Sequence, residues 1–334
     1  MTRTPSAIRT RSNRGVAISE RDLNRLRLLG RWHSLTAEHI VRSEQPSTLW
    51  SPTQHSAQSP EARAKFGRAV EAAKRRLRTL KAIEDDPGIG LGPLLGTALA
   101  SNGATAYFAS RIGARTAGLP WNLRNAINPN ICQHAWMAAD IGMALESAGY
   151  RVLSEREIAT GIDRHADEIT AQLESEDTAN GRSTGKRPDV AILAPNEAEY
   201  IAIEVERDTD RSISVYEQKL SAYASNASIR AVWYICASKT TAKRVADGAT
   251  RVFKSPGNFP LRIMTIPQIN CLHFLDVSNL SERAKRDLEA MRPGPAVSAL
   301  SERAETSLGT ATPAVDEFAD DGLSTNDVSP VSQR

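Results

Sequence analysis

Two neighbouring segments, Arg187-Pro-Asp-Val-Ala-Ile-Leu193 and Tyr200-Ile-Ala-Ile-Glu-Val-Glu206, decide the fold that we expect for this sequence of 334 residues. Both segments are largely apolar over the length of a strand. Between them, Pro195-Asn-Glu197 has the composition of a turn. The sequence therefore predicts an antiparallel hairpin with its turn near residues 196 and 197.

This hairpin predicts a group of carboxylates on one patch. A turn at that position places Asp189 opposite Glu204, and Glu206 shares the face of Glu204 because strand side chains alternate. Like charges this close are unfavourable unless a metal ion, a lysine or shared protons offset them. The residues expected to point the other way, into a core, are Ile201, Ile203 and Val205.

A helix predicted after the hairpin supplies a partner for these acids. Within Tyr216-Glu-Gln-Lys-Leu-Ser-Ala-Tyr223, Gln218 and Lys219 would lie early on the helix. Two interpretations stay open. Asp189 and Glu204 hold a metal ion with Glu206 as an auxiliary ligand, or the acids pair with Arg187, Arg207 or Lys219 in a structural network.

The order of elements from residue 131 to 292 predicts a mixed sheet with helices, interrupted by an insertion at 156–186. Short apolar runs bounded by polar residues indicate buried strands. The expected strands are 150–155, 188–194, 199–206, 230–236 and 261–266, and the expected helices are 131–148, 163–174 in the insertion, 212–226 and 240–253. We interpret His134 as a helix histidine rather than a ligand, and His33 and His39 as surface or capping groups.

The N-terminal third predicts a winged helix-turn-helix over residues 19–112. Ser19 caps a first helix with Asp22 at its third position, and Thr36 caps a second. A third helix over 60–81 has one apolar face and a basic opposite side. Residues 85–93 would form the turn of the wing, 104–112 a closing helix and 113–130 a linker. The basic residues expected to contact DNA are Lys65, Arg68, Lys74, Arg75, Arg76 and Arg78.

Charge is distributed unevenly along the chain, although the net charge is only +3. Residues 1–81 contain 17 Lys or Arg against 6 Asp or Glu, whereas residues 293–334 contain 2 against 7. The basic end points to a polyanion, with nucleic acid as the default and a merely solvated surface as the alternative. Residues 1–18 and 293–334 are expected to be a disordered basic arm and a disordered acidic tail.

Other features of the composition favour a cytoplasmic protein without a membrane segment. No apolar run approaches the roughly 20 residues needed to cross a bilayer, and the N-terminus lacks the apolar core of a secretory signal. The three cysteines are far apart in sequence and include no C-x-x-C pair. This pattern suits reduced thiols and argues against a structural zinc site.

The second half of the chain resembles the PD-(D/E)XK, or restriction-endonuclease-like, core in its αβββαβ order. Pro188-Asp189 matches the first half of that motif, and Glu204-Val-Glu206 matches E-x-K except that Glu206 stands in place of the lysine. The resemblance implies a divalent metal, usually magnesium, on Asp189 and Glu204. It also implies that Lys219 or Gln218 takes the part of the missing lysine.

The whole arrangement is similar to the replication-relaxation family of plasmid and mobile-element proteins over about residues 20–270. The stretches that carry this are Lys74–Leu80, the helix with His134, Lys186–Asp189, Ile203–Arg207 and Lys219–Tyr223. The resemblance implies double-stranded DNA as partner, in plasmid replication, relaxation or mobilisation. We rank a DNA-binding protein first, a magnesium-dependent DNA endonuclease second because of Glu206, and a non-catalytic scaffold for a relaxase or replication complex third.

Overall fold

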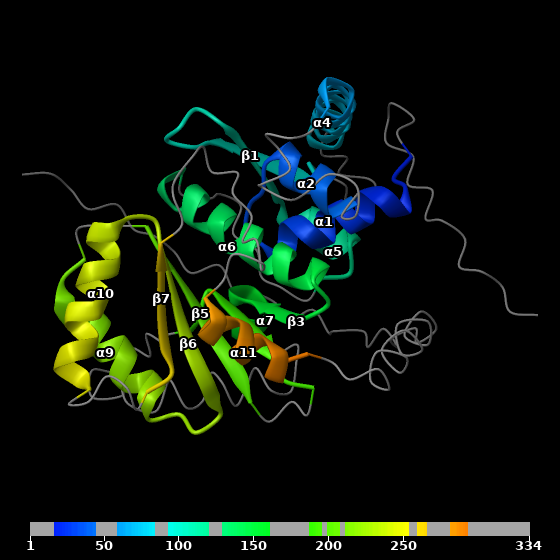
Figure 1. Ribbon diagram of the computed structural model, residues 1–334. Coiled ribbons are helices and arrows are strands. Elements are labelled where there is room, and N and C mark those ends of the chain that lie inside the picture. Colours follow the sequence, from blue (N-terminus) through cyan, green and yellow to red (C-terminus); the bar gives the residue numbers. More distant parts are fainter. Residues whose placement is uncertain are drawn as a thin grey trace, which may run out of the picture. The chain divides into compact units, whose positions relative to one another are not determined.

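A five-stranded mixed sheet forms the centre of the structure, which is a computed structural model (Figure 1). Its strand order is β3-β4-β5-β6-β7, with β3, β4 and β5 antiparallel and β5, β6 and β7 parallel. The strands are β3 (Arg151–Ser154), β4 (Val190–Leu193), β5 (Tyr200–Glu206), β6 (Ile229–Cys236) and β7 (Leu261–Thr265). The structure describes residues 17–44, 59–83, 93–119, 129–160, 187–195, 199–207, 211–253, 259–265 and 281–292.

The predicted hairpin between β4 and β5 is confirmed, including its register. Val190 pairs with Ile203 and Leu193 with Tyr200, so the register places Asp189 next to Glu204 at the end of the hairpin. The predicted alternation is also present. Ile201, Ile203 and Val205 belong to one hydrophobic cluster, whereas Tyr200 and Ala202 belong to a second cluster.

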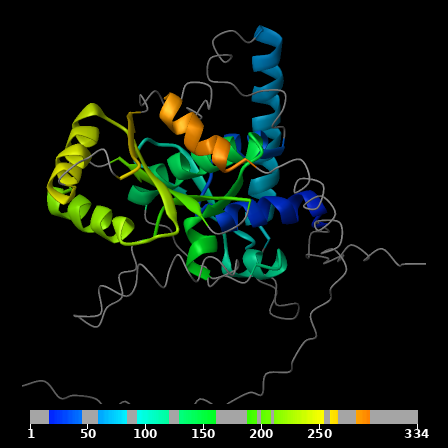
Figure 2. The ribbon, with the colours of Figure 1, turned by 60° about the horizontal axis from the view of Figure 1, so that its bottom comes forward.

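Helices cover both faces of the sheet (Figures 1 and 2). On one face lie α6 (Pro129–Ser147) and α11 (Glu282–Ala290), and on the other lie α9 (Ile213–Ala224) and α10 (Lys239–Val252). A short helix, α7 (Glu155–Thr160), follows β3 directly. All strands and helices expected here are therefore present, except the helix at 163–174, which falls outside the described residues.

The described N-terminal elements are three helices followed by an antiparallel hairpin. They are α1 (Glu20–Arg31), α2 (Ala37–Glu44), α4 (Pro60–Lys81), β1 (Leu95–Leu99) and β2 (Thr105–Ala109). Ser19 and Asp22 form the predicted capping box of α1. Leu35, between α1 and α2, forms an antiparallel bridge with Tyr107 of β2.

The prediction of a helix over residues 104–112 is wrong. This stretch forms β2, and α5 (Arg111–Thr116) begins only after Ser110, whose side chain accepts a hydrogen bond from the Gly113 backbone. Thr105, Tyr107 and Phe108 favour a strand. Gly103, with φ of 79°, allows the tight turn back to β1.

Part of the stretch expected to be a linker is also helical. Residues 113–116 belong to α5, and α6 already begins at Pro129. A Cβ added at Gly113 would lie 2.0 Å from the Leu94 carbonyl oxygen, so the start of α5 packs directly against the backbone before β1. The expected turn at 85–93 lies outside the described residues except for its last residue, as do residues 1–16 and 293–334.

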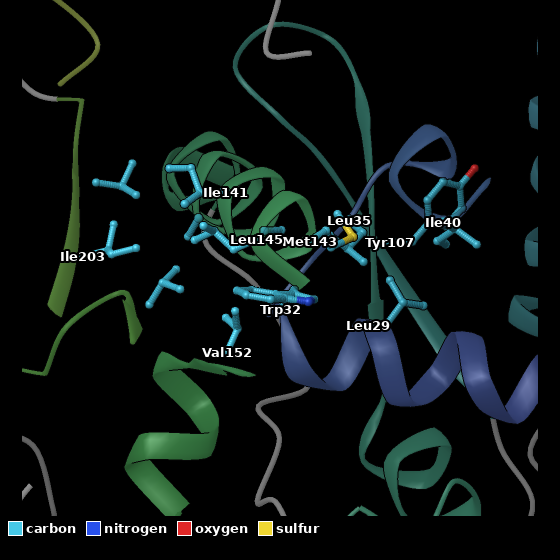
Figure 3. Packing of buried hydrophobic residues seen from close by; sticks show 14 of the residues in the cluster. Leu29, Trp32, Leu35, Ile40, Tyr107, Ile141, Met143, Leu145, Val152 and Ile203 are labelled. Carbon is cyan, nitrogen blue, oxygen red and sulfur yellow. The ribbon is translucent and has the colours of Figure 1, made fainter. Parts of the chain in front are cut away.

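One hydrophobic cluster joins the N-terminal helices to the sheet. It includes residues of α1, α2 and α4, the inner side of α6 and the α6-facing side of β4, β5 and β6. Trp32 lies between α6 and Val152 of β3 (Figure 3). Its ring packs so closely on Gly142 that an added Cβ would lie 2.0 Å from the Trp32 Cη2 atom. All described elements belong to one compact unit, Met1–Pro293.

Candidate functional site

A cleft of about 560 Å³ opens where the hairpin β4–β5 meets α6, α9 and the end of α1. Asp189, Glu206 and Lys219, three of the predicted site residues, line it. The other lining residues are Arg31, Trp32, His33, Ile131, His134, Ala135, Ala138, Ser154, Glu155, Arg187, Arg207, Arg211 and Val215. The hairpin register and the helix after it thus bring the acids and Lys219 to one place.

Asp189 is held at the start of β4 by two hydrogen bonds. Its Oδ1 lies 3.0 Å from His134 Nε2, and its Oδ2 accepts a hydrogen bond of 2.7 Å from the Val205 backbone N–H. Burial alone would raise the pKa of Asp189, but the positive charge of His134 and these hydrogen bonds hold the pKa at about 2. Asp189 is therefore an anion throughout the neutral range.

His134 is the partner that the sequence interpretation did not identify. It lies on α6, and the charge of Asp189 raises its pKa to about 9 despite burial. At neutral pH the imidazole is therefore protonated and both of its nitrogens are donors. Our interpretation of His134 as an ordinary helix histidine missed this pairing. The sequence signals were a histidine among apolar residues of a predicted helix and the place of that helix in the family resemblance.

Glu204 is buried behind the wall of the cleft. The Lys219 ammonium and the Tyr223 hydroxyl both donate hydrogen bonds to its carboxylate, one to each oxygen. Burial raises the pKa of Glu204 to about 7, against the opposing effect of the Lys219 charge. Glu204 thus forms the structural pair with Lys219 that the sequence interpretation had left as one of two alternatives.

Lys219 keeps its charge although it is largely buried. Burial lowers its pKa, but the charges of Glu204 and Asp189 outweigh that effect and raise the pKa above the usual lysine value. Lys219 is therefore a donor near the acids, not a base poised to lose a proton. Its neighbour Gln218 is exposed on α9 and is not among the described residues that line the cleft.

Glu206 occupies the place where the resembled motif has a lysine. It is 3% exposed, and the Arg211 guanidinium lies 3.2 Å from its Oε2. Burial raises the pKa of Glu206, while Arg211 opposes that shift. The three acids of the predicted patch are therefore each matched by a basic side chain of the chain itself.

The residues as arranged do not fit a divalent metal ion. Magnesium needs carboxylate oxygens that are open to it. All four oxygens of Asp189 and Glu204 already accept hydrogen bonds, and the nearest charges are the cations of His134 and Lys219. In the part of the chain that the structure describes, no group of three or more His, Cys, Asp or Glu side chains is placed to hold a metal.

Residues from the N-terminal helices complete the cleft, which the sequence did not suggest. Arg31 of α1 donates hydrogen bonds to Glu157 and to the Val152 carbonyl, and it also pairs with Glu146. His33 has a φ of 62° and accepts a hydrogen bond of 3.1 Å from Arg156. These contacts fix the end of α1 against β3, α6 and α7.

Of the two interpretations of His39, the capping group is confirmed, since its Nδ1 accepts a hydrogen bond from the Thr36 backbone before α2, and the surface group is wrong. His39 is fully buried, and its Nε2 lies 3.1 Å from Asp140 Oδ1. Arg42, also buried, lies 3.2 Å from the same oxygen, and burial lowers its pKa to about 10. A buried polar cluster of these three side chains therefore links α2 to α6.

The basic side of α4 is the second candidate site. Lys65, Arg68, Arg75 and Arg78 are exposed and make no side-chain hydrogen bond or ion pair within the described part of the chain. Two further predicted DNA contacts are engaged internally. Arg76 pairs with Asp22 of α1 and donates to the Ala17 carbonyl, and Lys74 pairs with Glu71.

Comparisons of the chain with protein-family models, with curated proteins and with solved structures found no match. Among the described helices, none combines the length and apolar character needed to cross a membrane. The α4 surface and the cleft are therefore the two features of the described chain that bear on its function.

Proposed function

We propose that this chain binds duplex DNA through the basic side of α4, as a winged-helix protein in plasmid or mobile-element replication, relaxation or mobilisation. The observation that carries the proposal is the group of exposed cations at Lys65, Arg68, Arg75 and Arg78, for which the described chain offers no hydrogen-bond or ion-pair partner. Side chains of this kind suit the phosphates of a duplex, which give affinity without sequence preference.

The surroundings of α4 support the same proposal. No residue of α4 before Val70 is buried, and in Figure 2 one end of this helix, drawn in blue, extends beyond the other helices and strands. The succession α1, the Leu35 bridge, α2, α4 and the β1–β2 hairpin is the order of a winged helix. In that arrangement α4 would be the helix that enters the major groove.

The test is the salt dependence of binding to a fluorescent duplex, followed by anisotropy. Replacing Arg68, Arg75 and Arg78 together by Gln is expected to weaken binding at least about tenfold. It should also reduce the slope of log K against log salt by about 0.9 for each phosphate that the variant no longer neutralises. A matched control replaces Arg283, Lys285 and Arg286 of α11 by Gln, which removes the same charge elsewhere.

An equal loss of affinity in the α4 and α11 variants would show a general charge effect and contradict the role of α4. No binding by the unaltered protein would contradict the proposal altogether. A loss confined to the α4 variant, with unchanged thermal unfolding, would support it.

A second candidate function is a magnesium-dependent DNA endonuclease, which would require His134 and Lys219 to release the carboxylates that they contact in this structure. The observation that favours it is the placement of Asp189, Glu204 and Lys219 together beside one cleft. Metal-dependent nicking of supercoiled plasmid, abolished in both Asp189→Ala and Glu204→Ala, would establish it. If plasmid stays intact while the α4 surface binds DNA, the chain is a DNA-binding accessory protein. If neither occurs, a scaffold for a relaxase or replication complex remains.

A further inference from the structure

No residue of α4 lines the cleft beside β4 and β5, and the lining of the cleft indicates a ligand of its own. Five of its lining residues are Arg or Lys, whereas three are Asp or Glu. All three acids are already paired, Asp189 with His134, Glu206 with Arg211 and Glu155 with His33. An entering ligand therefore meets mainly donor groups.

The donors of the cleft are held in place but retain bonding capacity. The Lys219 ammonium has three N–H groups and Arg207 and Arg211 have five each. Lys219 donates to Glu204, Arg207 donates to Gln133 through one terminal nitrogen, and Arg211 contacts Glu206 through one terminal nitrogen. Side chains anchored in this way lose little conformational freedom when they bind an anion, which favours affinity.

Two apolar side chains lie beside these donors. Ile131 at the start of α6 is 46% exposed and Val215 at the start of α9 is 37% exposed, and both line the cleft. Apolar surface next to anion-binding donors suits a ligand with a charged group at one end and a flat or apolar body at the other. The volume of about 560 Å³ lies within the range of about 300–1,000 Å³ typical of small-molecule sites.

We propose that this cleft binds the phosphate of a single nucleotide unit, without a divalent metal ion, with Lys219, Arg207 and Arg211 as the phosphate donors and Ile131 and Val215 against the sugar and base. Arginine recognises phosphate through its fork of N–H groups, and lysine adds a compact charge. A nucleotide supplies the phosphate either at the end of a single strand or as a free mononucleotide.

Asp189 and Glu204 have a positioning role in this proposal. Asp189 fixes the orientation of His134, and Glu204 fixes Lys219 together with Tyr223. In this way the acids hold two cations at the wall of the cleft instead of coordinating a metal. The resemblance to nuclease-like proteins implied a different role for Asp189 and Glu204, as ligands of a metal ion.

The test measures binding of a single-stranded hexanucleotide with a 5′-phosphate and a 3′-fluorophore, by anisotropy with EDTA present. The unaltered full chain is expected to bind it, and the 5′-hydroxyl form about tenfold more weakly, because that form keeps only its singly charged internal phosphates and lacks the terminal phosphate, which has higher charge and one more free oxygen for the arginines. Competition with a nucleoside monophosphate and with inorganic phosphate separates the two sources. Displacement by the mononucleotide at similar concentration identifies a free nucleotide as a ligand, and its failure identifies the strand end.

Two variants, one that removes a positive charge from the cleft and one that removes a negative charge, test the cleft itself. Arg211→Gln removes a donor and should weaken binding about tenfold, whereas Glu206→Gln removes a competing negative charge and should strengthen it. A purely structural role of this ion pair would make both variants weaker. Both are compared at matched thermal stability, and Arg207→Gln supplies a further donor variant that leaves the Glu206 pair intact.

The outcomes separate this proposal from duplex binding. Binding in EDTA that weakens in Arg211→Gln and Arg207→Gln, strengthens in Glu206→Gln and is unchanged in the α4 triple variant supports the cleft. No binding, a requirement for magnesium, or sensitivity to the α4 variant alone would overturn it. Duplex binding by α4 can fail or succeed independently of each of these results.

Discussion

Helices α4 and α6 are of similar length but have different surroundings. In α4, the buried residues are Val70, Ala73, Leu77 and Leu80, all on one side, and the opposite side carries exposed cations. In α6, residues 138–143 are buried without interruption. That helix contacts the sheet, α2, Trp32 and the cleft through different side chains.

Helix α4 therefore exposes one charged side to solvent, whereas α6 contacts neighbouring elements on most of its sides. Most cations of α4 are exposed and have no ion-pair partner among the described residues, so they can meet a long polyanion and should respond strongly to salt. The charged side chains of α6 are each directed at internal partners: His134 at Asp189, Asp140 at His39 and Arg42, and Glu146 at Arg31. Substitutions should therefore alter binding when made on α4 and folding when made on α6.

The largest effect is expected for Asp140→Ala. This change leaves Arg42 and His39, both buried, without the carboxylate that they share. Removing one member of a buried charged pair destabilises by about 3 kcal/mol or more. Urea unfolding followed by circular dichroism measures the loss of stability.

A control variant and a double variant show whether that loss of stability comes from the buried charges. Glu71→Ala on α4 removes an acid whose pair with Lys74 is exposed, and no change in unfolding midpoint is expected. The double variant Asp140→Asn with Arg42→Met, which removes both charges, should be more stable than Asp140→Ala. An Asp140→Ala protein as stable as the unaltered chain would show that the cluster does not join α2 to α6.

A matched pair of glycine substitutions is expected to change stability in opposite directions. A Cβ at Gly142 of α6 would overlap the buried Trp32 ring, and such overpacking typically destabilises by about 1–3 kcal/mol. A Cβ at Gly67 of α4 meets no atom within 4 Å, so Gly67→Ala should stabilise by about 0.5–1 kcal/mol through helix propensity. Thermal unfolding of both variants is the measurement, and a stabilised Gly142→Ala protein would contradict the packing of Trp32 on α6.

The sequence could predict those parts of the fold that have a periodic pattern of apolar residues or a helix-capping residue. The register of β4 and β5 followed from a two-residue alternation and a short turn, and α4 from a stripe of apolar residues bounded by polar ones. The strand β2 could not be predicted in the same way. Its residues Ala106 to Ala109 form a short apolar run without the β-branched residues and the following turn that mark β4 and β5, and such a run cannot be distinguished from a buried helix by periodicity.

The site was predictable only in part for the same reason. Asp189 and Glu204 came together because the hairpin fixed both, and Lys219 followed on the next helix. His134 and Arg31 reach the cleft from elements whose position depends on tertiary packing alone. A histidine on a helix buried on nearly all sides has no periodic signal that would reveal its partner.

A further, pH-dependent effect concerns the charge that anchors α4. Arg76 Nε lies 2.9 Å from Asp22 Oδ1, and the Ser19 backbone donates to the same carboxylate. Burial would raise the pKa of Asp22, but these hydrogen bonds lower it below the ordinary value. The carboxylate therefore stabilises the fold fully above the unfolded pKa of about 3.9, and its contribution falls as pH drops through the lower folded pKa.

Asp22→Asn should accordingly destabilise the chain by about 1 kcal/mol at pH 6, as expected for a weakened helix cap. The difference from the unaltered protein should shrink toward pH 3, in urea unfolding at each pH. A difference that stays constant or grows as pH falls would show that the charge of Asp22 is not what holds Arg76. Because Arg76 is engaged in this way, Arg76→Gln should lower stability while leaving duplex affinity nearly unchanged, unlike Arg75→Gln one residue earlier on the exposed side.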